Sequence, residues 1–324
     1  MKIAIMGSIH QDGIDKIKDN SFDYFEITNF ETNSLINELG DVDAIVLRTA
    51  ELKENVLSHC KKLKIIARHG VGYDNVDSKY LDENKIALGI TGTANAVSVA
   101  EHVMTMFLYL TKKINNSDLA TKRGNFNERN TLPEFFELYK KNILILGFGR
   151  IGQELAKRCI GFDTKIYIFD PFVEKKVIEE KNYFPVLTKE EGLKIADYIS
   201  IHMPLNEKTK NFISYDEFKI LKKNAIIVNS ARGGIINEEA LYLALKNNYI
   251  LGAGIDVFTQ EPPKENHPFF DLDNIVLSPH NAALTLECKK RMSIESCENI
   301  IYYLNKDKKL NKENIVNKKI IDLL

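Results

Sequence analysis

Short runs of Ile, Val and Leu alternate with longer amphipathic stretches along most of the chain. An apolar run of strand length followed by a segment of helix length is typical of βα units, whose strands pair in parallel. The alternation therefore predicts an α/β protein. At 324 residues, the chain exceeds the size at which a single hydrophobic core usually keeps growing, so we expect two domains.

The predicted strands fall into two series. The first suggests a small open sheet with its own core, and its members are Ile3–Met6, Tyr24–Ile27, Ala44–Leu47, Ile65–Ala67 and Ile86–Ile90. The second has enough strands for a full dinucleotide-binding sheet, and its members are Ile143–Leu146, Ile166–Phe169, Tyr198–Ile201, Ala225–Val228, Ile250–Ala253 and Ile275–Leu277. Each series predicts one parallel sheet.

Two amphipathic segments are predicted to connect the domains. Val97–Ile114 is expected to form one long helix that begins at Ser98, because Ser98 and Glu101 have the spacing of a capping box. Leu284–Leu304 is not followed by a strand pattern and is expected to cross back to the first domain.

The tail, Asn305–Leu324, is rich in Lys and Asn, which could indicate a basic arm. Acidic residues are mixed in, however, and Ile315 and Val316 have the character of buried residues. The tail is therefore predicted to be a solvated terminal segment.

The composition favours a small-molecule partner in the cytoplasm. The formal net charge is -1, with 44 basic and 45 acidic residues, which provides no overall field to attract nucleic acid or an anionic membrane. The amino terminus lacks the pattern of a secretory signal, and no apolar run reaches the roughly 20 residues that span a bilayer. The four cysteines form no Cys-x-x-Cys pair, so we predict neither a metal site nor a disulfide framework.

A glycine-rich loop follows the first strand of the second series. Gly147, Gly149 and Gly152 form a Gly-x-Gly-x-x-Gly pattern that opens the helical stretch Gln153–Cys159. This pattern is weak by itself, and an ordinary glycine turn remains the alternative, but the strand before it and the helix after it favour a pyrophosphate site at a helix N-terminus. Asp170 lies 18 residues after Gly152 at the end of the next strand, so it is predicted to hold the ribose hydroxyls and to favour NAD over NADP.

Further polar residues follow the strands of the second series. Open α/β sheets bind ligands beyond the carboxyl ends of their strands, and six residues at these ends are expected to line one edge: Gly147, Asp170, His202, Ser230, Asp256 and His280.

Three side chains near this edge suggest proton transfer beside a bound anion. Arg232 precedes two glycines and is suited to hold a carboxylate through two hydrogen bonds. Glu261 precedes two prolines, and His280 follows the last strand. A carboxylate beside an imidazole selects its tautomer and favours its protonated form. Alone, each could be structural, with Arg232 in a surface ion pair and His280 in the core, but together they favour catalysis.

These residues resemble the D-isomer-specific 2-hydroxyacid dehydrogenase family, which includes D-3-phosphoglycerate dehydrogenase and the glyoxylate and hydroxypyruvate reductases. Besides the glycine loop and the three segments just described, the resemblance rests on Ala67–Asp77, Ala100-Glu-His102 and His202–Thr209. It implies two Rossmann or flavodoxin-like domains, with an NAD-binding domain at 98–284 inserted into a substrate domain made of 1–97 and 285–324. It further implies an active site in the cleft and a homodimer built around the NAD domain.

The resemblance also implies individual roles. Arg232 would bind the carboxylate and carbonyl oxygen of the substrate, His280 would exchange a proton with that oxygen, and Glu261 would orient His280. The substrate's carboxylate would lie on the backbone of Gly70, Val71 and Gly72. The implied NAD contacts are Gly147, Gly149, Arg150, Ile151 and Gly152 for the pyrophosphate, Asp170 for the ribose, and Ser230, Ala231, Arg232, Asp256 and His280 beside the nicotinamide, with His202, Met203, Pro204 and Thr209 nearby.

The identity of the 2-hydroxy acid is less constrained. Family members that use phosphoglycerate bind its phosphate with a basic residue of the first domain, and Arg48 lies at a matching strand end, although it could equally be an ordinary exposed side chain. Val71 is apolar where those members often have Thr. The segment after His280 lacks the aromatic residue usual in D-lactate dehydrogenases. The extra substrate-orienting residues and the longer amino-terminal region expected of formate dehydrogenases are not found either.

Two further expectations concern regulation and function class. The chain ends soon after the crossing helix, so no regulatory ligand-binding domain and no feedback control are expected. Relatives of the family act as NAD-sensing transcriptional corepressors, and a binding protein without significant turnover is the alternative function. We expect an NAD-dependent oxidoreductase acting on a small D-2-hydroxy acid, because the chain lacks disordered extensions with interaction motifs.

Overall fold

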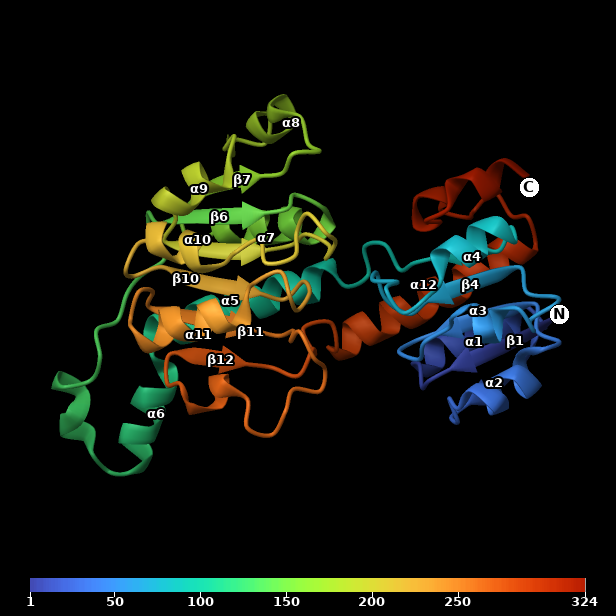
Figure 1. The fold of residues 1–324 in the computed structure, drawn as a ribbon, viewed down its shortest axis with the longest axis horizontal. Helices are drawn as coiled ribbons and strands as arrows, with labels where there is room; N and C mark the ends of the chain where they lie inside the picture. Colours follow the sequence, from blue (N-terminus) through green and yellow to red (C-terminus); the bar gives the residue numbers. More distant parts are fainter. Residues whose placement is uncertain (324) are drawn as a thin grey trace. The chain divides into compact units, whose positions relative to one another are not determined.

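The computed structural model describes residues 1–323 and forms two compact units, each with its own parallel sheet (Figure 1). Unit 1 consists of Met1–Asn95 and Leu284–Leu324, and unit 2 consists of Ala96–Ala283. These boundaries differ by one or two residues from those expected from the sequence. No helix within the described residues is long and apolar enough to cross a membrane.

Unit 1 contains a five-stranded parallel sheet in the order β2-β1-β3-β4-β5. Its strands are β1 (Lys2–Met6), β2 (Asp23–Ile27), β3 (Ala44–Leu47), β4 (Ile65–Arg68) and β5 (Ala87–Gly89). This order is that of the flavodoxin-like doubly wound fold. Apart from the edge strand β2, the strands are almost entirely buried because helices cover both faces, which explains why they appear in the sequence as continuous apolar runs.

Each face of this sheet has its own hydrophobic core. One core includes Ile14 and Ile17 of α1 and Ile300 of α12, and the other includes Leu35 of α2 and Leu81 of α4. The helices of unit 1 are α1 (Gln11–Asp19), α2 (Thr32–Leu39), α3 (Glu54–Leu57), α4 (Ser78–Glu83) and α12 (Leu286–Leu304). As predicted, the last long amphipathic segment is a helix that packs in the first unit.

The tail corrects one prediction. Between α12 and residue 320, it packs on unit 1 instead of remaining solvated, with Leu310, Ile315 and Ile320 buried. Ile315 forms a bridge with Gly89, and the N–H of Val316 donates to the carbonyl of Leu88 at 2.8 Å. The burial of Ile315 agrees with its apolar character, whereas the Lys- and Asn-rich composition wrongly favoured a solvated segment over one that packs at the β5 edge. The tail includes η3 (Lys312–Asn314) and η4 (Lys318–Leu323).

Unit 2 contains a seven-stranded parallel sheet in the order β12-β11-β10-β9-β6-β7-β8. Its strands are β6 (Asn142–Leu146), β7 (Lys165–Phe169), β8 (Phe184–Pro185), β9 (Tyr198–Ile201), β10 (Ile226–Asn229), β11 (Gly252–Ile255) and β12 (Ile275–Leu277). The order reverses at β6, which is the topological switch point of a dinucleotide-binding fold. The sequence did not predict β8, because two residues produce no apolar run, and β11 begins two residues later than expected.

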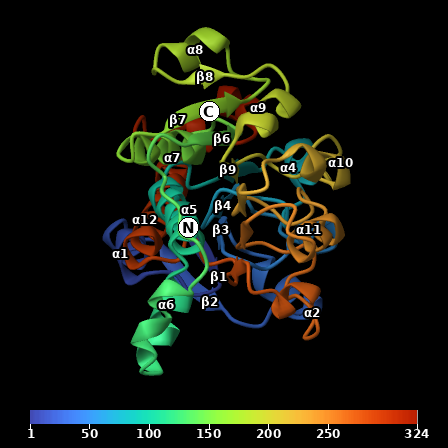
Figure 2. The ribbon, with the colours of Figure 1, turned by 90° about the vertical axis from the view of Figure 1, so that its left-hand side faces the viewer.

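Helices cover both faces of this sheet, with α5 and α7 on one face and α9, α10 and α11 on the other (Figure 2). These helices are α5 (Ala96–Lys112), α7 (Arg150–Ile160), α9 (Lys189–Ile195), α10 (Tyr215–Ile220) and α11 (Glu238–Lys246). The remaining helical segments of the unit are α6 (Ile114–Lys122), η1 (Phe126–Asn130), α8 (Lys175–Glu179) and η2 (Pro268–Asp271).

The long helix predicted at Val97–Ile114 is present as α5, but both of its ends differ from the prediction. It begins at Ala96, two residues before Ser98, so Ser98 lies inside the helix and is not its N-cap. It ends at Lys112, because Lys113 has a left-handed backbone with φ of 49° and starts the separate helix α6. Ser98 is buried, which indicates that tertiary packing decided the start of the helix.

Candidate active site

The glycine loop brings helix α7 into close contact with strand β6. Gly147 has a φ of +100°, and a Cβ atom there would lie 2.6 Å from the carbonyl oxygen of His202. A Cβ atom at Gly152 would lie 2.3 Å from the carbonyl oxygen of Gly147. Gly149 is the N-cap of α7, has no side-chain cap and faces open space. The start of α7 can therefore receive a pyrophosphate on its backbone.

Asp170 lies directly after β7 and supports the glycine loop. Its Oδ2 atom accepts a hydrogen bond from the Phe148 N–H at 2.8 Å, and its Oδ1 atom accepts one from the Phe172 N–H at 2.9 Å. A carboxylate has about four acceptor positions, so ribose hydroxyls could still bind. Phe172 is 93% exposed, and the sequence analysis did not identify this aromatic neighbour of the predicted ribose site.

Two buried polar atoms near the switch point have no hydrogen-bond partner. They are Nδ1 of His202 and Oγ of Ser230. Nε2 of His202 contacts Oγ of Ser200 at 2.7 Å, and burial lowers the pKa of His202 to about 3, so the ring is neutral. Buried polar atoms are usually satisfied, and these two, together with the narrow glycine loop, fit a dinucleotide that completes the site.

The other residues predicted near the nicotinamide lie in the loops that follow β9 and β10. Met203 is partly buried and packs against the core of unit 2. Thr209 and Pro204 lie in an exposed loop and bind each other, with Thr209 Oγ1 donating to the Pro204 carbonyl at 2.6 Å. Ala231 lies in the loop after β10, and its N–H donates to Asn229 Oδ1 at 3.0 Å.

Arg232 is held in the loop that follows β10. The buried Asn229 closes this loop, because its Nδ2 donates to the Arg232 carbonyl at 2.8 Å. The guanidinium of Arg232 donates through Nη1 to the Ala231 carbonyl at 2.7 Å. The sequence analysis did not assign a role to Asn229. An Asn at a strand end, which can bond its own backbone two or three residues on, was the signal for this turn.

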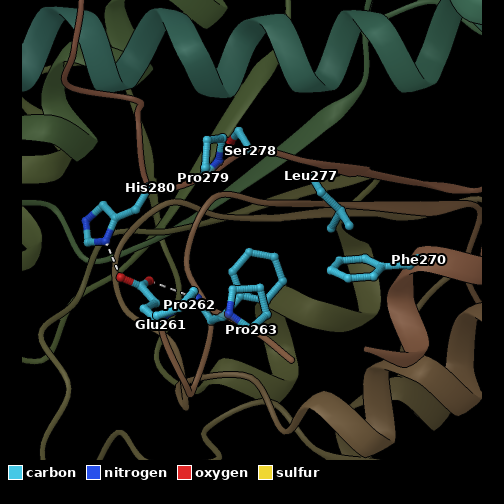
Figure 3. Close-up of a pocket in the computed structure, with 9 residues that line it drawn as sticks. Glu261, Pro262, Pro263, Phe270, Leu277, Ser278, Pro279 and His280 are labelled. Atoms are coloured by element: carbon cyan, nitrogen blue, oxygen red, sulfur yellow. Dashed lines mark hydrogen bonds and ion pairs between the residues drawn. The ribbon is translucent and has the colours of Figure 1, made fainter. Parts of the chain in front are cut away.

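His280 and Glu261 form a hydrogen-bonded pair (Figure 3). Nδ1 of His280 lies 2.8 Å from Oε2 of Glu261, while Oε1 of Glu261 accepts the Phe258 N–H at 3.0 Å. The side chains are 49% and 38% exposed, respectively. Both carboxylate oxygens are thus engaged, and His280 carries a hydrogen on Nδ1. Its Nε2 is the nitrogen that can exchange a proton with a ligand.

The pair borders an apolar pocket with a volume of about 450 Å³. Figure 3 shows His280 and Glu261 at one side of it. Besides this pair and Ser278, its lining consists of Phe258, Pro262, Pro263, Phe270, Leu277 and Pro279. The loops that carry the pair are therefore supported by apolar and proline side chains.

Asp256 is fully buried at the end of β11. Its Oδ1 accepts hydrogen bonds from Ser278 Oγ at 2.5 Å and from the Asn281 N–H at 2.9 Å, and its Oδ2 accepts one from the Ala282 N–H at 3.1 Å. The carboxylate thus binds the chain around His280. Its predicted position beside the nicotinamide remains a prediction.

In unit 1, basic side chains gather at the ends of β3 and β4. Arg48 donates through Nη1 to the Ser8 carbonyl at 3.1 Å. Arg68 donates to the carbonyls of Gly72 at 2.8 Å and Leu47 at 2.9 Å, and it also bonds the Arg48 carbonyl. Arg68 therefore ties the Gly70–Gly72 loop to the end of β3. The sequence analysis missed this role, although a basic residue closing a buried strand was a usable signal.

His69 lies beside that loop and is also buried, with no hydrogen-bond partner for Nε2. Burial, with a smaller contribution from the neighbouring Arg48, lowers the pKa of His69 to about 4. In the described part of the chain, no group of three or more His, Cys, Asp or Glu side chains is arranged to hold a metal ion.

The fold and the glycine loop define a dinucleotide-binding protein of the doubly wound α/β class. Residues 104–282 match the model of the D-isomer specific 2-hydroxyacid dehydrogenase NAD binding domain. The chain belongs to the D-isomer specific 2-hydroxyacid dehydrogenase family, and its cofactor is NAD.

Named relatives agree with this assignment. The chain is 36% identical over 318 residues to a D-3-phosphoglycerate dehydrogenase of Methanocaldococcus jannaschii, covering 98% of this chain but only 59% of the relative. It is 37% identical over 281 residues to a hydroxypyruvate reductase of Thermotoga maritima, covering 85% of this chain and 90% of the relative. The structure of an NAD-dependent formate dehydrogenase from Staphylococcus aureus has a TM-score of 0.83 and 26% identity, with 98% and 99% of the chains covered.

Proposed function

We propose that this protein is an NAD-dependent oxidoreductase that interconverts a small D-2-hydroxy acid and its 2-keto acid. The observation that carries the proposal is the His280–Glu261 pair, whose Nδ1 to Oε2 distance is 2.8 Å and whose imidazole is half exposed. A proton donor held in one tautomer at a strand end of a dinucleotide-binding sheet is what reduction of a carbonyl requires. The family and its named members add support.

In this mechanism, Nε2 of His280 gives a proton to the carbonyl oxygen during reduction and takes it back during oxidation. Bound NADH supplies the hydride. Glu261 holds the imidazole through Nδ1 and stabilises the imidazolium form. Arg232 binds the carboxylate and carbonyl oxygen of the substrate. As negative charge grows on that oxygen, a preplaced cation and proton donor stabilise the transition state more than the ground state.

We assign the cofactor contacts by the same reasoning. Gly147, Gly149, Arg150, Ile151 and Gly152 surround the pyrophosphate, and Asp170 binds the adenosine ribose. Ser230, Ala231 and Asp256 border the nicotinamide, with His202, Met203, Pro204 and Thr209 nearby. The buried, unpartnered atoms of His202 and Ser230 support this part of the proposal.

The substrate is proposed to be phosphohydroxypyruvate or an unphosphorylated relative such as hydroxypyruvate or glyoxylate. The backbone of Gly70, Val71 and Gly72 in unit 1 would bind its carboxylate, and Arg48 would bind a distal phosphate. The grouping of Arg48, Arg68 and a neutral His69 at one sheet edge favours an anionic ligand.

The protein is further proposed to form a homodimer through unit 2. The segment that begins with α6 projects from the body of unit 2 (Figures 1 and 2), and exposed apolar side chains lie along it before the chain returns to the core at Leu138. Ile114, Phe126 and Phe135 are 53%, 65% and 47% exposed. Burial of these groups against a second copy would stabilise association. Sedimentation analysis of the wild type and of Phe126→Ser should show a dimer weakened by the substitution, and a wild-type monomer would reject this part.

A cytoplasmic location is also proposed. All four cysteines are buried, and burial raises the pKa of Cys60 to about 11 and of Cys159 to about 12. Such thiols suit a reducing compartment, where cysteines serve as small core residues.

The decisive experiment follows NADH oxidation by the purified protein with hydroxypyruvate, glyoxylate, phosphohydroxypyruvate, pyruvate and longer 2-keto acids. A preference for phosphohydroxypyruvate that is lost in Arg48→Ala would identify the substrate and the role of Arg48. Preference for an unphosphorylated acid would mean that Arg48 does not bind a substrate phosphate. NADH binding without turnover of any acid would reject the enzyme and favour an NAD-sensing binding protein.

A further inference from the structure

Asp256 of unit 2 accepts hydrogen bonds from the backbone around His280, and the His280 N–H also donates to the Ser278 carbonyl at 3.1 Å. Three consecutive N–H groups bind Asp256: that of His280 donates to the backbone carbonyl at 2.8 Å, and those of Asn281 and Ala282 donate to the carboxylate. His280 itself has a φ of 50°, a left-handed conformation that residues with a side chain seldom adopt. Asp256 therefore maintains the backbone conformation that presents the imidazole.

The Asp256 carboxylate needs partners because it is fully buried. A buried charge is costly unless hydrogen bonds satisfy it. Ser278 Oγ lies 2.5 Å from Oδ1 of Asp256, so the hydroxyl hydrogen is donated to the carboxylate. A lone pair of the same hydroxyl then faces Nε2 of His102, 2.9 Å away.

His102 completes this line from helix α5. The Ser278 hydroxyl donates its only hydrogen to Asp256. In the hydrogen bond between Ser278 and His102, Nε2 of His102 must therefore be the donor. The same Nε2 atom lies 3.8 Å from Oδ1 of Asp256. The side chain of His102 is 23% exposed, and the mechanism proposed above assigns it no part.

We propose that Ser278 and His102 are positioning residues for His280. They complete the hydrogen bonding of the Asp256 carboxylate, which in turn holds the backbone of residues 280–282 so that the imidazole meets Glu261 of the neighbouring loop. The proposal rests on the proposed function, in which His280 moves the proton. Small displacements of a catalytic group can reduce a rate by about 10²-fold, so a loosened loop should reduce the chemical step while NADH binding persists.

The test compares Ser278→Ala with Ser278→Thr, and His102→Phe with His102→Gln. Thr retains the hydroxyl and Gln retains an N–H donor, whereas Ala and Phe retain neither. Thr105→Val is the matched control, because Thr105 lies on the same helix as His102 and its hydroxyl donates to the Glu101 carbonyl, away from Asp256 and Ser278. For each variant, kcat, the KM for NADH and the isotope effect with deuterated NADH are measured.

The proposal predicts a loss in kcat of about 10-fold to 10²-fold for Ser278→Ala and His102→Phe, with an unchanged KM for NADH and a larger isotope effect. Ser278→Thr and His102→Gln should recover most of the rate. An unchanged kcat in the Ala and Phe variants would overturn it. So would a parallel loss of kcat, NADH binding and thermal stability that Thr and Gln fail to restore, since that pattern indicates a general packing role.

A second readout separates this proposal from the proposed function. In nitrogen-labelled protein, the imidazole resonances of His280 report its hydrogen bond to Glu261 without any turnover. They should change in Ser278→Ala but not in Thr105→Val, and identical spectra would overturn the positioning role. If the wild-type protein binds NADH but reduces no keto acid, the proposed function fails, while the spectra still decide whether Ser278 positions His280.

Discussion

The two units begin in the same way but use that beginning differently. In each, the first strand is followed by a glycine with positive φ, namely +93° for Gly7 and +100° for Gly147. In each, the following helix has a glycine as its third residue, Gly13 in α1 and Gly152 in α7. In unit 1, Gly13 lets α1 pack closely against Ser293 of α12. In unit 2, Gly152 lets α7 pack closely against Gly147 of the preceding loop.

The N-termini of these two helices differ in their electrostatics. In α1, the His10 side chain accepts the Asp12 N–H at 3.2 Å, and Asp12 places a negative charge in the first turn. In α7, the N-cap is Gly149, which has no side-chain cap, and the first turn has no acidic residue. A helix N-terminus stabilises negative charge. Unit 1 supplies that charge from its own chain, while unit 2 leaves the position to the pyrophosphate in the proposed function.

The largest expected effect tests whether the chemistry belongs to unit 2. His280→Gln should lower kcat by about 10²–10⁴-fold, because it removes the proposed general acid and base, while NADH binding is retained. His267→Gln is the matched control, since His267 also contacts a carboxylate, Glu238, at 3.4 Å but lies among aromatic rings. Steady-state kinetics check both variants. Equal losses in the two would mean that His280 has no special role.

A smaller effect should separate the two helix glycines. In Gly152→Ala, the new Cβ would lie 2.3 Å from the Gly147 carbonyl oxygen, so the loop must shift and the affinity for NADH should fall about tenfold, or about 1.4 kcal/mol. In Gly13→Ala, the Cβ would lie 2.2 Å from Ser293 Oγ, which should lower the free energy of unfolding by about 1–3 kcal/mol without affecting NADH. Calorimetric titration and urea unfolding distinguish them, and a similar loss of affinity in both variants would contradict the comparison.

Cofactor choice should depend on the acid of unit 2 alone. Asp170→Ala removes the charge that would repel a 2′-phosphate, so the preference for NADH over NADPH should narrow by about tenfold. Asp12→Ala, which removes the acidic residue from the first turn of α1 in unit 1, should leave the preference for NADH over NADPH unchanged. Rates with both cofactors provide the measurement. If Asp170→Ala keeps the wild-type ratio, cofactor choice lies with other residues.

Near neutral pH, the smallest expected effect concerns one buried histidine in each unit, and this effect grows as the pH falls. Burial lowers the pKa of His69 to about 4 and that of His202 to about 3, from an ordinary value of 6.5. The unfolded chain therefore binds more protons, so this stability is complete above about pH 6.5 and is lost as the pH falls toward the folded values, by about 1.4 kcal/mol per pH unit for each group. Urea unfolding at several pH values should show a shallower dependence for His69→Gln and His202→Gln. An unchanged slope would mean that the rings are solvated.

Much of this fold could be predicted because buried parallel strands produce continuous apolar runs, as at Ile143–Leu146 and Ala44–Leu47. What could not be predicted had a weak local signal. Strand β8 has only two residues, and in the tail the many Lys and Asn residues favoured a solvated segment although Ile315 has the character of a buried residue. The capping-box spacing at Ser98 predicted a helix start that the structure places at Ala96, because Ser98 is buried in the packing of the unit.

The same distinction applies to the candidate site. The sequence by itself determined the α/β class, the glycine loop and the residue types at the strand ends, because these depend on local pattern and on the common direction of parallel strands. Only the tertiary structure decided which atoms join Glu261 to His280, that Asp256 binds the loop after β12, and that His102 reaches Ser278 from helix α5. Such contacts join residues distant in the chain, and their geometry depends on how the loops and helices pack.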